Sequence, residues 1–250
     1  MTANFLDYKP DNDLLNDKII LVTGAGDGIG KAAAVAFAGH GATVILAGRT
    51  IAKLEIVYDQ IEQSGFPVPM IYPVDLNGAS EEDYLTLRQS IEQEFGRLDG
   101  LLHNASELGD RTPIANYKLT VWEKVLQTNV TAQFMMTKAL LPVLEKANNG
   151  SIVFTSSGVG RKGKAFWGAY AVSKFATEGL CQVLASELEE TTAIRVNCIN
   201  PGATRTAMRA RAYPAEDPGT VRTPEEIIGT YLYLMGDESL STTGQSLNAQ

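Results

Sequence analysis

The chain has 250 residues, of which 44% are hydrophobic and 20% are charged, and its formal net charge is −8. This length suits one α/β domain and is short for two, and such an acidic chain is a poor partner for nucleic acid or for an anionic membrane surface. Its two cysteines, Cys181 and Cys198, cannot build a disulfide framework or a zinc site, so we expect no metal.

The N-terminal segment, residues 1–17, is polar and acidic, and it lacks the basic and apolar regions of a signal peptide. We expect it to be an extension in front of the domain. The chain has no run of about 18 apolar residues, the length that a membrane span needs. These features favour a cytoplasmic protein with no membrane partner.

Short apolar runs alternate with helical patterns along the rest of the chain. In order, the patterns predict strand 18–24, helix 29–41, strand 42–49, helix 51–65, strand 69–75, helix 80–96, strand 98–105, a helical stretch at roughly 117–147, strand 150–157, helix 168–190, strand 193–202, a polar segment 203–224, helix 224–236 and strand 244–249. Ser80 and Asp83 form an N-cap pair at the start of the third helix. Ile, Val and Leu occupy both faces of the strands, which is typical of a parallel sheet covered on both sides. We therefore predict a single α/β domain with a Rossmann-type, doubly wound parallel β-sheet and helices on both faces.

The first predicted strand runs directly into a glycine-rich turn, "TGAGDGIG" at residues 23–30. Gly24, Gly28 and Gly30 permit positive φ and close backbone approach, and the helix that follows offers unpaired N–H groups to a pyrophosphate. The turn thus indicates a dinucleotide site, although a tight turn that uses glycine for its geometry alone is an alternative. It is not a P-loop, because Ala32 stands where a Ser or Thr would hold magnesium.

The spacing T-G-x-x-x-G-x-G resembles that of the short-chain dehydrogenase/reductase family, and the resemblance runs from about residue 18 to 249. Further motifs match in the same order: "HNAS" at 103–106, "TNV" at 128–130, "SS" at 156–157, "YAVSK" at 170–174 and "NPG" at 200–202. The glycine turn and the ending "GQSLNAQ" look most like one bacterial subgroup of oxidoreductases in that family. One departure is Ser106, which stands where the family has glycine.

Tyr170 and Lys174 are four residues apart on a predicted helix, so their side chains share a face. A free tyrosine has a pKa of about 10, and a neighbouring ammonium favours the phenolate. We therefore expect Lys174 to lower the pKa of Tyr170 and Tyr170 to act as the general acid and base. The resemblance implies that Ser157, thirteen residues before Tyr170, orients the substrate oxygen. It also implies that Asn129 binds a water that passes protons to Lys174, although a helix kink or a structural amide is an equally good interpretation of Asn129.

The second predicted strand ends in "ILAGRT", where an NAD enzyme often has an acid for the ribose 2′-hydroxyl. Here Gly48 removes that carboxylate, and Arg49 can bind a 2′-phosphate. We expect NADP(H) as the cofactor. Asp27, inside the glycine turn, places a negative charge near the 2′-phosphate and weakens this preference, so NAD(H) is a second cofactor that the pocket could take. A surface arginine that merely starts a helix is the alternative for Arg49.

The resemblance extends the cofactor site to residues of later elements. It implies that Asp75 accepts from the adenine amino group, that Asn104 and Ala105 lie over the adenosine, and that Lys174 binds the nicotinamide ribose. Pro201 and Gly202 would approach the nicotinamide, and Thr206 would contact its carboxamide. The remaining cofactor contacts expected from these stretches are Ile29, Leu76 and Thr204.

Residues 203–224 stand where the family keeps a variable substrate lid. The segment carries Arg205, Arg209, Arg211 and Arg222 in an acidic chain, which suggests a substrate with a carboxylate or phosphate. A mobile solvated loop is the stronger alternative. Trp167 could wall an apolar pocket, and residues 107–117 would form the opposite wall.

Apolar residues such as Phe134, Met135, Phe175 and Leu180 exceed what one sheet face needs, and in the family the equivalent helices pair across a two-fold axis. We therefore expect a homodimer or homotetramer.

The leading functional interpretation is an NADP(H)-dependent carbonyl reductase or alcohol dehydrogenase that acts on CH–OH groups. A cofactor-binding sensor of the same fold is the second interpretation, but a sensor has no need for Ser157, Tyr170 and Lys174. A methyltransferase, which also has a glycine turn, is disfavoured by the Tyr–Lys pair and by the missing acid after the second strand.

Overall fold

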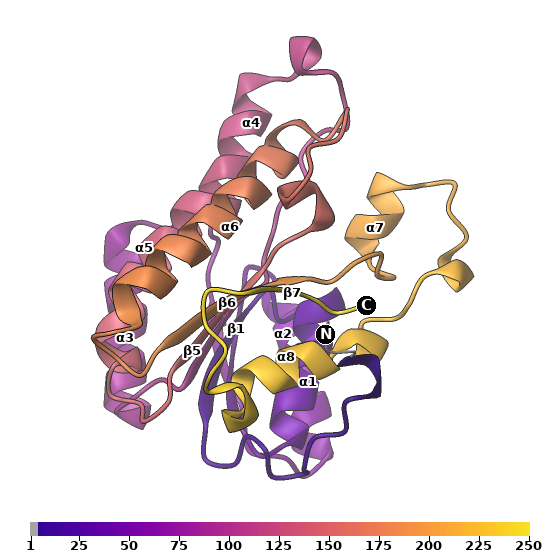
Figure 1. Ribbon diagram of the computed structural model, residues 1–250. Helices are drawn as coiled ribbons and strands as arrows, with labels where there is room; N and C mark the ends of the chain where they lie inside the picture. Colours follow the sequence, from indigo (N-terminus) through magenta and orange to yellow (C-terminus); the bar gives the residue numbers. More distant parts are fainter. Residues whose placement is uncertain (1–4) are drawn as a thin grey trace.

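Parallel strands form the centre of the molecule. A computed structural model describes residues 5–250, and within them the strands form one seven-stranded sheet (Figure 1). The strands are β1 (Ile19–Thr23), β2 (Thr43–Gly48), β3 (Met70–Pro73), β4 (Gly100–His103), β5 (Ser151–Thr155), β6 (Arg195–Asn200) and β7 (Ser246–Asn248). Each neighbouring pair is parallel, in the order β3-β2-β1-β4-β5-β6-β7. The doubly wound sheet and its seven strands are confirmed as the sequence predicts them.

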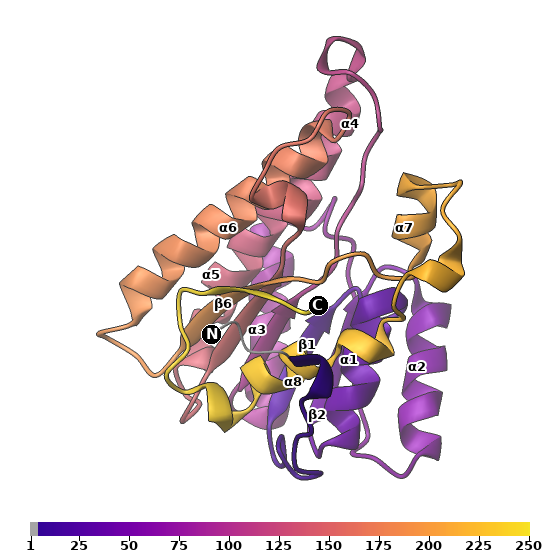
Figure 2. The same ribbon diagram turned by 45° about the vertical axis from the view of Figure 1, so that its right-hand side comes forward.

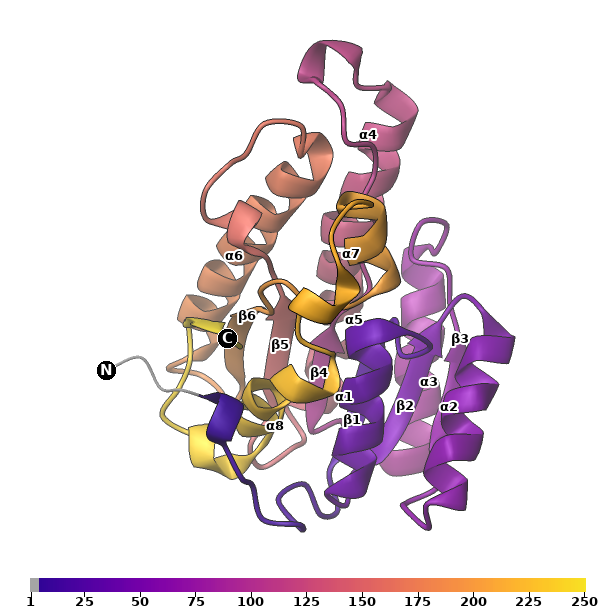
Figure 3. The same cartoon turned by 90° about the vertical axis from the view of Figure 1, so that its right-hand side faces the viewer.

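Two layers of helices cover the sheet (Figure 3). The helices are α1 (Gly28–Gly39), α2 (Ile51–Gln63), α3 (Glu81–Phe95), α4 (Leu119–Leu126), α5 (Ala132–Leu144), α6 (Gly168–Leu188), α7 (Ala207–Ala212) and α8 (Gly229–Met235). One apolar core lies under α1, α2 and α8, and a second lies under α3, α5 and α6. β1, β4, β5 and β6 are almost wholly buried, as is typical of parallel strands that helices cover on both faces.

The strand order reverses between β1 and β4. The chain moves outward from β1 to β2 and β3, then crosses back to β4 and continues to β7. Neighbouring connections at this point leave the sheet on opposite faces, so a crevice opens at the carboxyl ends of β1 and β4. Figure 3 shows α7 standing above this edge of the sheet.

Two expected helices are interrupted. The stretch at 117–147 is α4 and α5 joined by a π-helical turn, Gln127–Thr131, and the stretch at 224–236 begins with a 3₁₀ turn, Glu225–Ile227. The expected cap of α3 is confirmed: the Ser80 hydroxyl accepts from the Asp83 N–H, and the Asp83 carboxylate accepts from the Ser80 N–H at 2.7 Å.

The N-terminal segment packs against the body of the domain. The ring of Phe5 lies 4.8 Å from that of Tyr233 on α8, and the ring of Tyr8 lies 5.9 Å from it, as the darkest segment of Figure 2 shows beside α8. Leu15 is fully buried. The first four residues of the expected extension, 1–4, lie outside the described residues. Within residues 5–250 no helix has the length and hydropathy that a membrane crossing requires.

Candidate active site

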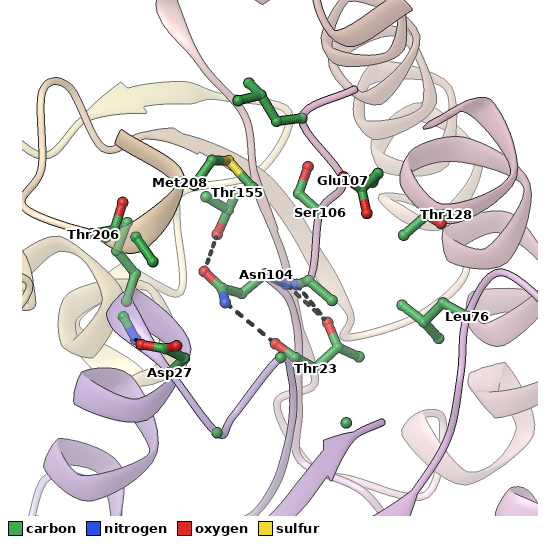
Figure 4. A pocket seen from close by; sticks show the side chains of 18 of the residues that line it. Thr23, Asp27, Leu76, Asn104, Ser106, Glu107, Thr128, Thr155, Thr206 and Met208 are labelled. Carbon is green, nitrogen blue, oxygen red and sulfur yellow. Dashed lines mark hydrogen bonds between the residues drawn. The ribbon is translucent and has the colours of Figure 1, made fainter. Parts of the chain in front are cut away.

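A cavity of about 440 Å³ opens beyond the carboxyl ends of the central strands (Figure 4). Of the residues expected at the cofactor and catalytic sites, all except Gly30 and Asn129 line it. They are Gly24, Asp27, Gly28, Ile29, Arg49, Asp75, Leu76, Asn104, Ala105, Ser157, Tyr170, Lys174, Pro201, Gly202, Thr204 and Thr206. The fold thus brings the glycine turn and the Tyr–Lys pair to one cavity.

The glycine turn between β1 and α1 has no space for side chains. Gly24 and Gly28 have φ values of +67° and +50°, which strain other residues. A Cβ on Gly30 would collide with the carbonyl oxygen of Gly24 and lie 2.6 Å from the Asn104 side-chain nitrogen. The N-terminus of α1, whose glycines carry no side chains, therefore borders the cavity, and such an end attracts phosphate groups.

Asp27 has two partners beside this turn. One carboxylate oxygen accepts from the Gly28 N–H at 2.8 Å and caps α1, and the other lies 2.5 Å from the Lys53 Nζ. The bond from Lys53 lowers the pKa of Asp27. Lys53 lines the cavity beside Arg49. Its ammonium therefore offsets the negative charge of Asp27, which was expected to weaken the binding of a 2′-phosphate here. Lys53 was not predicted from the sequence, because no motif links a residue of α2 to the glycine turn.

Asn104 is held by Thr23, another residue that the sequence analysis missed. The Thr23 hydroxyl accepts from the N–H groups of Asn104 and Ala105 at 2.9 and 3.1 Å. The Asn104 side chain donates to the Thr23 carbonyl at 3.3 Å and accepts from the Thr155 hydroxyl at 3.4 Å (Figure 4). These bonds join the ends of β1, β4 and β5 into a rigid floor under the cavity.

Tyr170 and Lys174 lie one turn apart on α6, and both side chains are buried. The Lys174 Nζ donates to the Thr155 carbonyl at 2.7 Å and lies 5.5 Å from the centre of the Tyr170 ring. The hydroxyls of Ser157 and Ser106 both lower the pKa of the Tyr170 phenol, while the Ser106 Oγ is buried and has no hydrogen-bond partner within residues 5–250. The serine that replaces the family's glycine at position 106 therefore adds a second hydroxyl beside the phenol.

Burial is the largest influence on the pKa of Tyr170 and on that of Lys174. It raises the pKa of Tyr170 to about 12, against smaller lowering effects of Ser157 and Ser106. It also lowers the pKa of Lys174 to about 8. The net pKa of Tyr170 is therefore raised and not lowered as expected, because a buried environment penalises the charged form of each group. The lowering effect expected of Lys174 stays a prediction. The phenol keeps its proton at neutral pH, which suits a proton donor.

Asn129 lies in the π-helical turn and is fully buried. Its side-chain oxygen accepts from the Glu107 N–H at 2.7 Å, and its nitrogen donates to the Glu107 carbonyl at 2.9 Å and to the Ser173 hydroxyl at 3.0 Å. Ser173 in turn donates to the Tyr170 carbonyl at 2.8 Å. These contacts favour the interpretation of Asn129 as a structural amide that ties the cavity wall to α6, and the expected proton-passing water stays a prediction.

The lid arginines are mostly engaged with protein groups. Arg205 donates to the carbonyls of Pro218 and Val221. Arg209 donates two hydrogen bonds of 2.6 Å to the Glu216 carboxylate and stacks on the Tyr213 ring. The Arg222 guanidinium lies 3.5 Å from the Glu226 carboxylate. Only Arg211 among the four has a loose contact, 3.9 Å from Glu107, and its side chain is 63% exposed. Arg211 is therefore the least engaged of the four arginines.

An arginine of the opposite wall holds the lid over the cavity. The Arg111 guanidinium lies 4.4 Å from the centre of the Trp167 ring and 5.0 Å from that of Tyr213, and it donates to the Ala212 carbonyl at the end of α7. Cation–π contacts of this kind contribute about 0.5–2 kcal/mol. Trp167 thus walls the apolar end of the cavity beside Tyr170, with the two rings 5.6 Å apart.

The parallel sheet, the glycine turn at its switch point and the adjacent Tyr–Lys pair form the arrangement that the sequence predicts for a dinucleotide-dependent oxidoreductase. The family model of short chain dehydrogenases matches residues 18–217. The chain belongs to this family of oxidoreductases.

Several relatives resemble the chain along nearly its full length. The oxidoreductase YciK of Escherichia coli K12 is 54% identical over 243 residues, 97% of this chain and 96% of YciK. This agrees with the bacterial subgroup, that of YciK-type oxidoreductases, which the glycine turn and the C-terminus indicated. A short chain dehydrogenase of Escherichia coli CFT073 complexed with NADPH and one of Shigella flexneri 2a complexed with NADP are each 54% identical, with TM-scores of 0.94 over 96% of this chain and all of theirs.

Proposed function

We propose that the protein transfers a hydride between NADP(H) and a substrate that carries a carbonyl or an alcohol. The observation that carries the proposal is the position of Tyr170, Lys174 and Ser157 in the same cavity as the glycine turn. Hydride transfer from NADPH to carbonyl compounds, with Tyr170→Phe as the inactive control, is the experiment that tests it.

Each catalytic residue has a role that its surroundings support. The Tyr170 phenol, protonated at neutral pH, donates its proton to the carbonyl oxygen during reduction and accepts one during oxidation. Lys174, fixed by the Thr155 carbonyl, places a positive charge beside the phenolate that forms. Ser157 donates a hydrogen bond to the substrate oxygen and orients it toward Tyr170. The cofactor, when bound, supplies or receives the hydride.

The residues of the cavity fit nicotinamide adenine dinucleotide phosphate. The glycine turn would hold the pyrophosphate, and Asp75 and Leu76, which line the same cavity, would contact the adenine. Arg49 and Lys53 line the end of the cavity next to β2, where a 2′-phosphate needs positive charge. The relatives complexed with NADP and NADPH are consistent with this choice.

Replacing Arg49 with glutamine is expected to raise the Kd for NADPH about tenfold, since a charge-assisted hydrogen bond contributes about 1.5 kcal/mol. The Kd for NADH should change little, because NADH has no 2′-phosphate. Fluorescence titration of both cofactors measures the two constants. Equal weakening for both cofactors would contradict the role assigned to Arg49.

The apolar end of the cavity suggests the character of the substrate. Leu108, Trp167 and Ala212 pack together with Tyr170, and Met208 lies against them. An apolar group next to the reacting carbonyl would therefore be accommodated, with Arg211 at the lid for an anionic end.

The outer face of α5 and α6 supports a homodimer or homotetramer. Phe134 on α5 and Phe175 on α6 are 49% and 47% exposed, and Val183 on α6 is 55% exposed. α6 packs against α4 and the π-helical turn that leads into α5 (Figure 1). Large apolar side chains at such exposure favour burial in an interface.

The variant Phe175→Glu is expected to shift the assembly toward the monomer, because a charge in an apolar interface is left unpaired. Size-exclusion chromatography with light scattering measures the mass. Ile56→Glu, at an exposed apolar residue of α2, is the control and should keep the wild-type mass. A wild-type protein that elutes as a monomer would contradict the proposed homodimer or homotetramer.

A further inference from the structure

An acidic side chain, that of Glu107, lines the cavity near its apolar end. Glu107 belongs to the segment that follows β4, and its neighbours Ser106 and Leu108 line the cavity with it. Figure 4 shows the side chains of Ser106 and Glu107 on the segment beyond Asn104. Leu108 packs in the same apolar cluster as Tyr170. Glu107 is therefore attached to the part of the wall that lies closest to the proposed proton donor.

The backbone of Glu107 is held in place on both sides. The buried Asn129 side chain accepts from the Glu107 N–H at 2.7 Å and donates to the Glu107 carbonyl at 2.9 Å. Two residues earlier, the Ala105 N–H donates to the Thr23 hydroxyl at 3.1 Å. The Glu107 side chain thus extends from a fixed point. A group that is already positioned loses little conformational entropy when it binds a ligand.

The Glu107 carboxylate lacks hydrogen bonds although it is largely sheltered. Its side chain is 16% exposed, and within residues 5–250 no N–H or O–H group donates to it. Its oxygens lie 3.4 Å from the Lys124 ammonium and 3.9 Å from the Arg211 guanidinium. Those two cations are 44% and 63% exposed, and ion pairs of such exposed groups contribute little. A carboxylate can accept about four hydrogen bonds, so this one has room for a donor from a ligand.

A neutral hydroxyl is the donor that suits this carboxylate best. Two cations already lie within 3.9 Å of it, and they would repel an ammonium group of a substrate. A hydroxyl adds no charge and satisfies an acceptor that is otherwise costly to shelter from water. Arg211 makes no hydrogen bond to Glu107, so it stays free for an anionic end of the same substrate.

We propose that Glu107 is a specificity-determining residue that accepts a hydrogen bond from a hydroxyl group of the substrate. The preferred substrates are then carbonyl compounds that carry a hydroxyl group, or the corresponding diols. The assignment rests on the proposed function for the reaction, but the binding of the hydroxyl does not. The rival role for Glu107 is purely structural: the carboxylate holds the lid through Arg211 and never meets the substrate.

The test compares pairs of ketones in which a terminal hydroxyl replaces a terminal methyl group of nearly the same size. The pairs are hydroxyacetone with butanone, 4-hydroxybutan-2-one with pentan-2-one, and 5-hydroxypentan-2-one with hexan-2-one, so that several chain lengths are covered. Ligand-observed NMR measures each Kd on the full-length protein in the presence of NADP⁺, which cannot reduce a ketone. The wild type is expected to bind the hydroxylated member of at least one pair about tenfold more tightly, the usual effect of a hydrogen bond to a charged group.

Three variants separate the two roles of Glu107. Glu107→Leu keeps an apolar side chain of similar length and removes the acceptor, so it should abolish the preference or reverse it. Arg211→Met breaks the contact with the lid and keeps the carboxylate, so it should retain the preference. Glu123→Leu, at an exposed residue of α4 outside the cavity, is the matched control and should bind every ketone as the wild type does.

A wild type without the preference in any pair overturns the proposal, and so does a Glu107→Leu variant that keeps it. An equal loss in Arg211→Met would assign the effect to the lid and overturn it as well. If Glu107→Leu does not fold, Glu107→Gln decides: loss of the charge should weaken the preference, and an unchanged preference contradicts the proposal.

Turnover of the same ketones with NADPH tests the proposed function separately. Ketones that bind with the expected preference but are never reduced would contradict the proposed function and leave the role of Glu107 intact. Ketones that are reduced without any preference for the hydroxyl would contradict the role of Glu107 alone.

Discussion

Replacing Tyr170 with phenylalanine is expected to lower kcat for carbonyl reduction by about 10²–10⁴-fold, the usual contribution of a general acid. The change removes the proton donor and keeps the ring that packs against Trp167. NADPH affinity should therefore change little. Steady-state kinetics and a cofactor titration of the same preparation measure the two effects separately.

The pH dependence gives this prediction a second readout. The pKa of Tyr170 of about 12 means that the phenol stays protonated across the working range, whereas Lys174, with a pKa of about 8, loses its charge first. Reduction by the wild type is thus expected to fall as the pH rises through about 8. Tyr58→Phe, on α2 outside the cavity, should behave as the wild type. A Tyr170→Phe variant that keeps most of its turnover would rule out Tyr170 as the acid.

The variant Gly30→Ala is expected to weaken NADPH binding by about 30- to 150-fold, because forcing an extra methyl group into a packed site costs about 2–3 kcal/mol. The added Cβ would collide with the Gly24 carbonyl oxygen and displace the Asn104 side chain. Either movement deforms the turn that would hold the pyrophosphate. Isothermal titration with NADPH and a thermal unfolding curve measure the losses in binding and stability.

Gly78→Ala is the matched control for this variant. Gly78 lies in a turn with no atom within 4 Å of an added Cβ and without a positive φ, so the change should leave NADPH binding and unfolding as they are. If Gly30→Ala bound NADPH as tightly as the control does, the glycine turn would not be the pyrophosphate site.

The sequence predicts the sheet well because each strand can be recognised from its local pattern of residues. Buried parallel strands such as β1 and β5 are unbroken apolar runs, and glycine or a cap marks most helix ends. The break at Gln127–Thr131 has no such signal. The π-helical turn there places Asn129 against the backbone of Glu107, a contact set by tertiary packing. The helix α7 inside the lid was likewise not expected, because six residues, of which three are alanines, give no clear period.

The site was predictable where a motif fixes the spacing. Ser157, Tyr170 and Lys174 follow a pattern that one can count along the chain, and they meet in one cavity. Lys53, Thr23 and Arg111 act across long separations in the sequence, so only the fold shows them. The pKa of Tyr170 was predicted in the wrong direction because the spacing gives the distance to Lys174 but not the burial that both groups share.

The most direct test of the proposed function is the oxidation of NADPH by the purified protein with a panel of aldehydes, ketones, quinones and acyl thioesters. The account predicts turnover with at least one carbonyl class, and its loss in Tyr170→Phe. Tight binding of NADPH without turnover of any class would contradict the account and favour a protein that senses the cofactor.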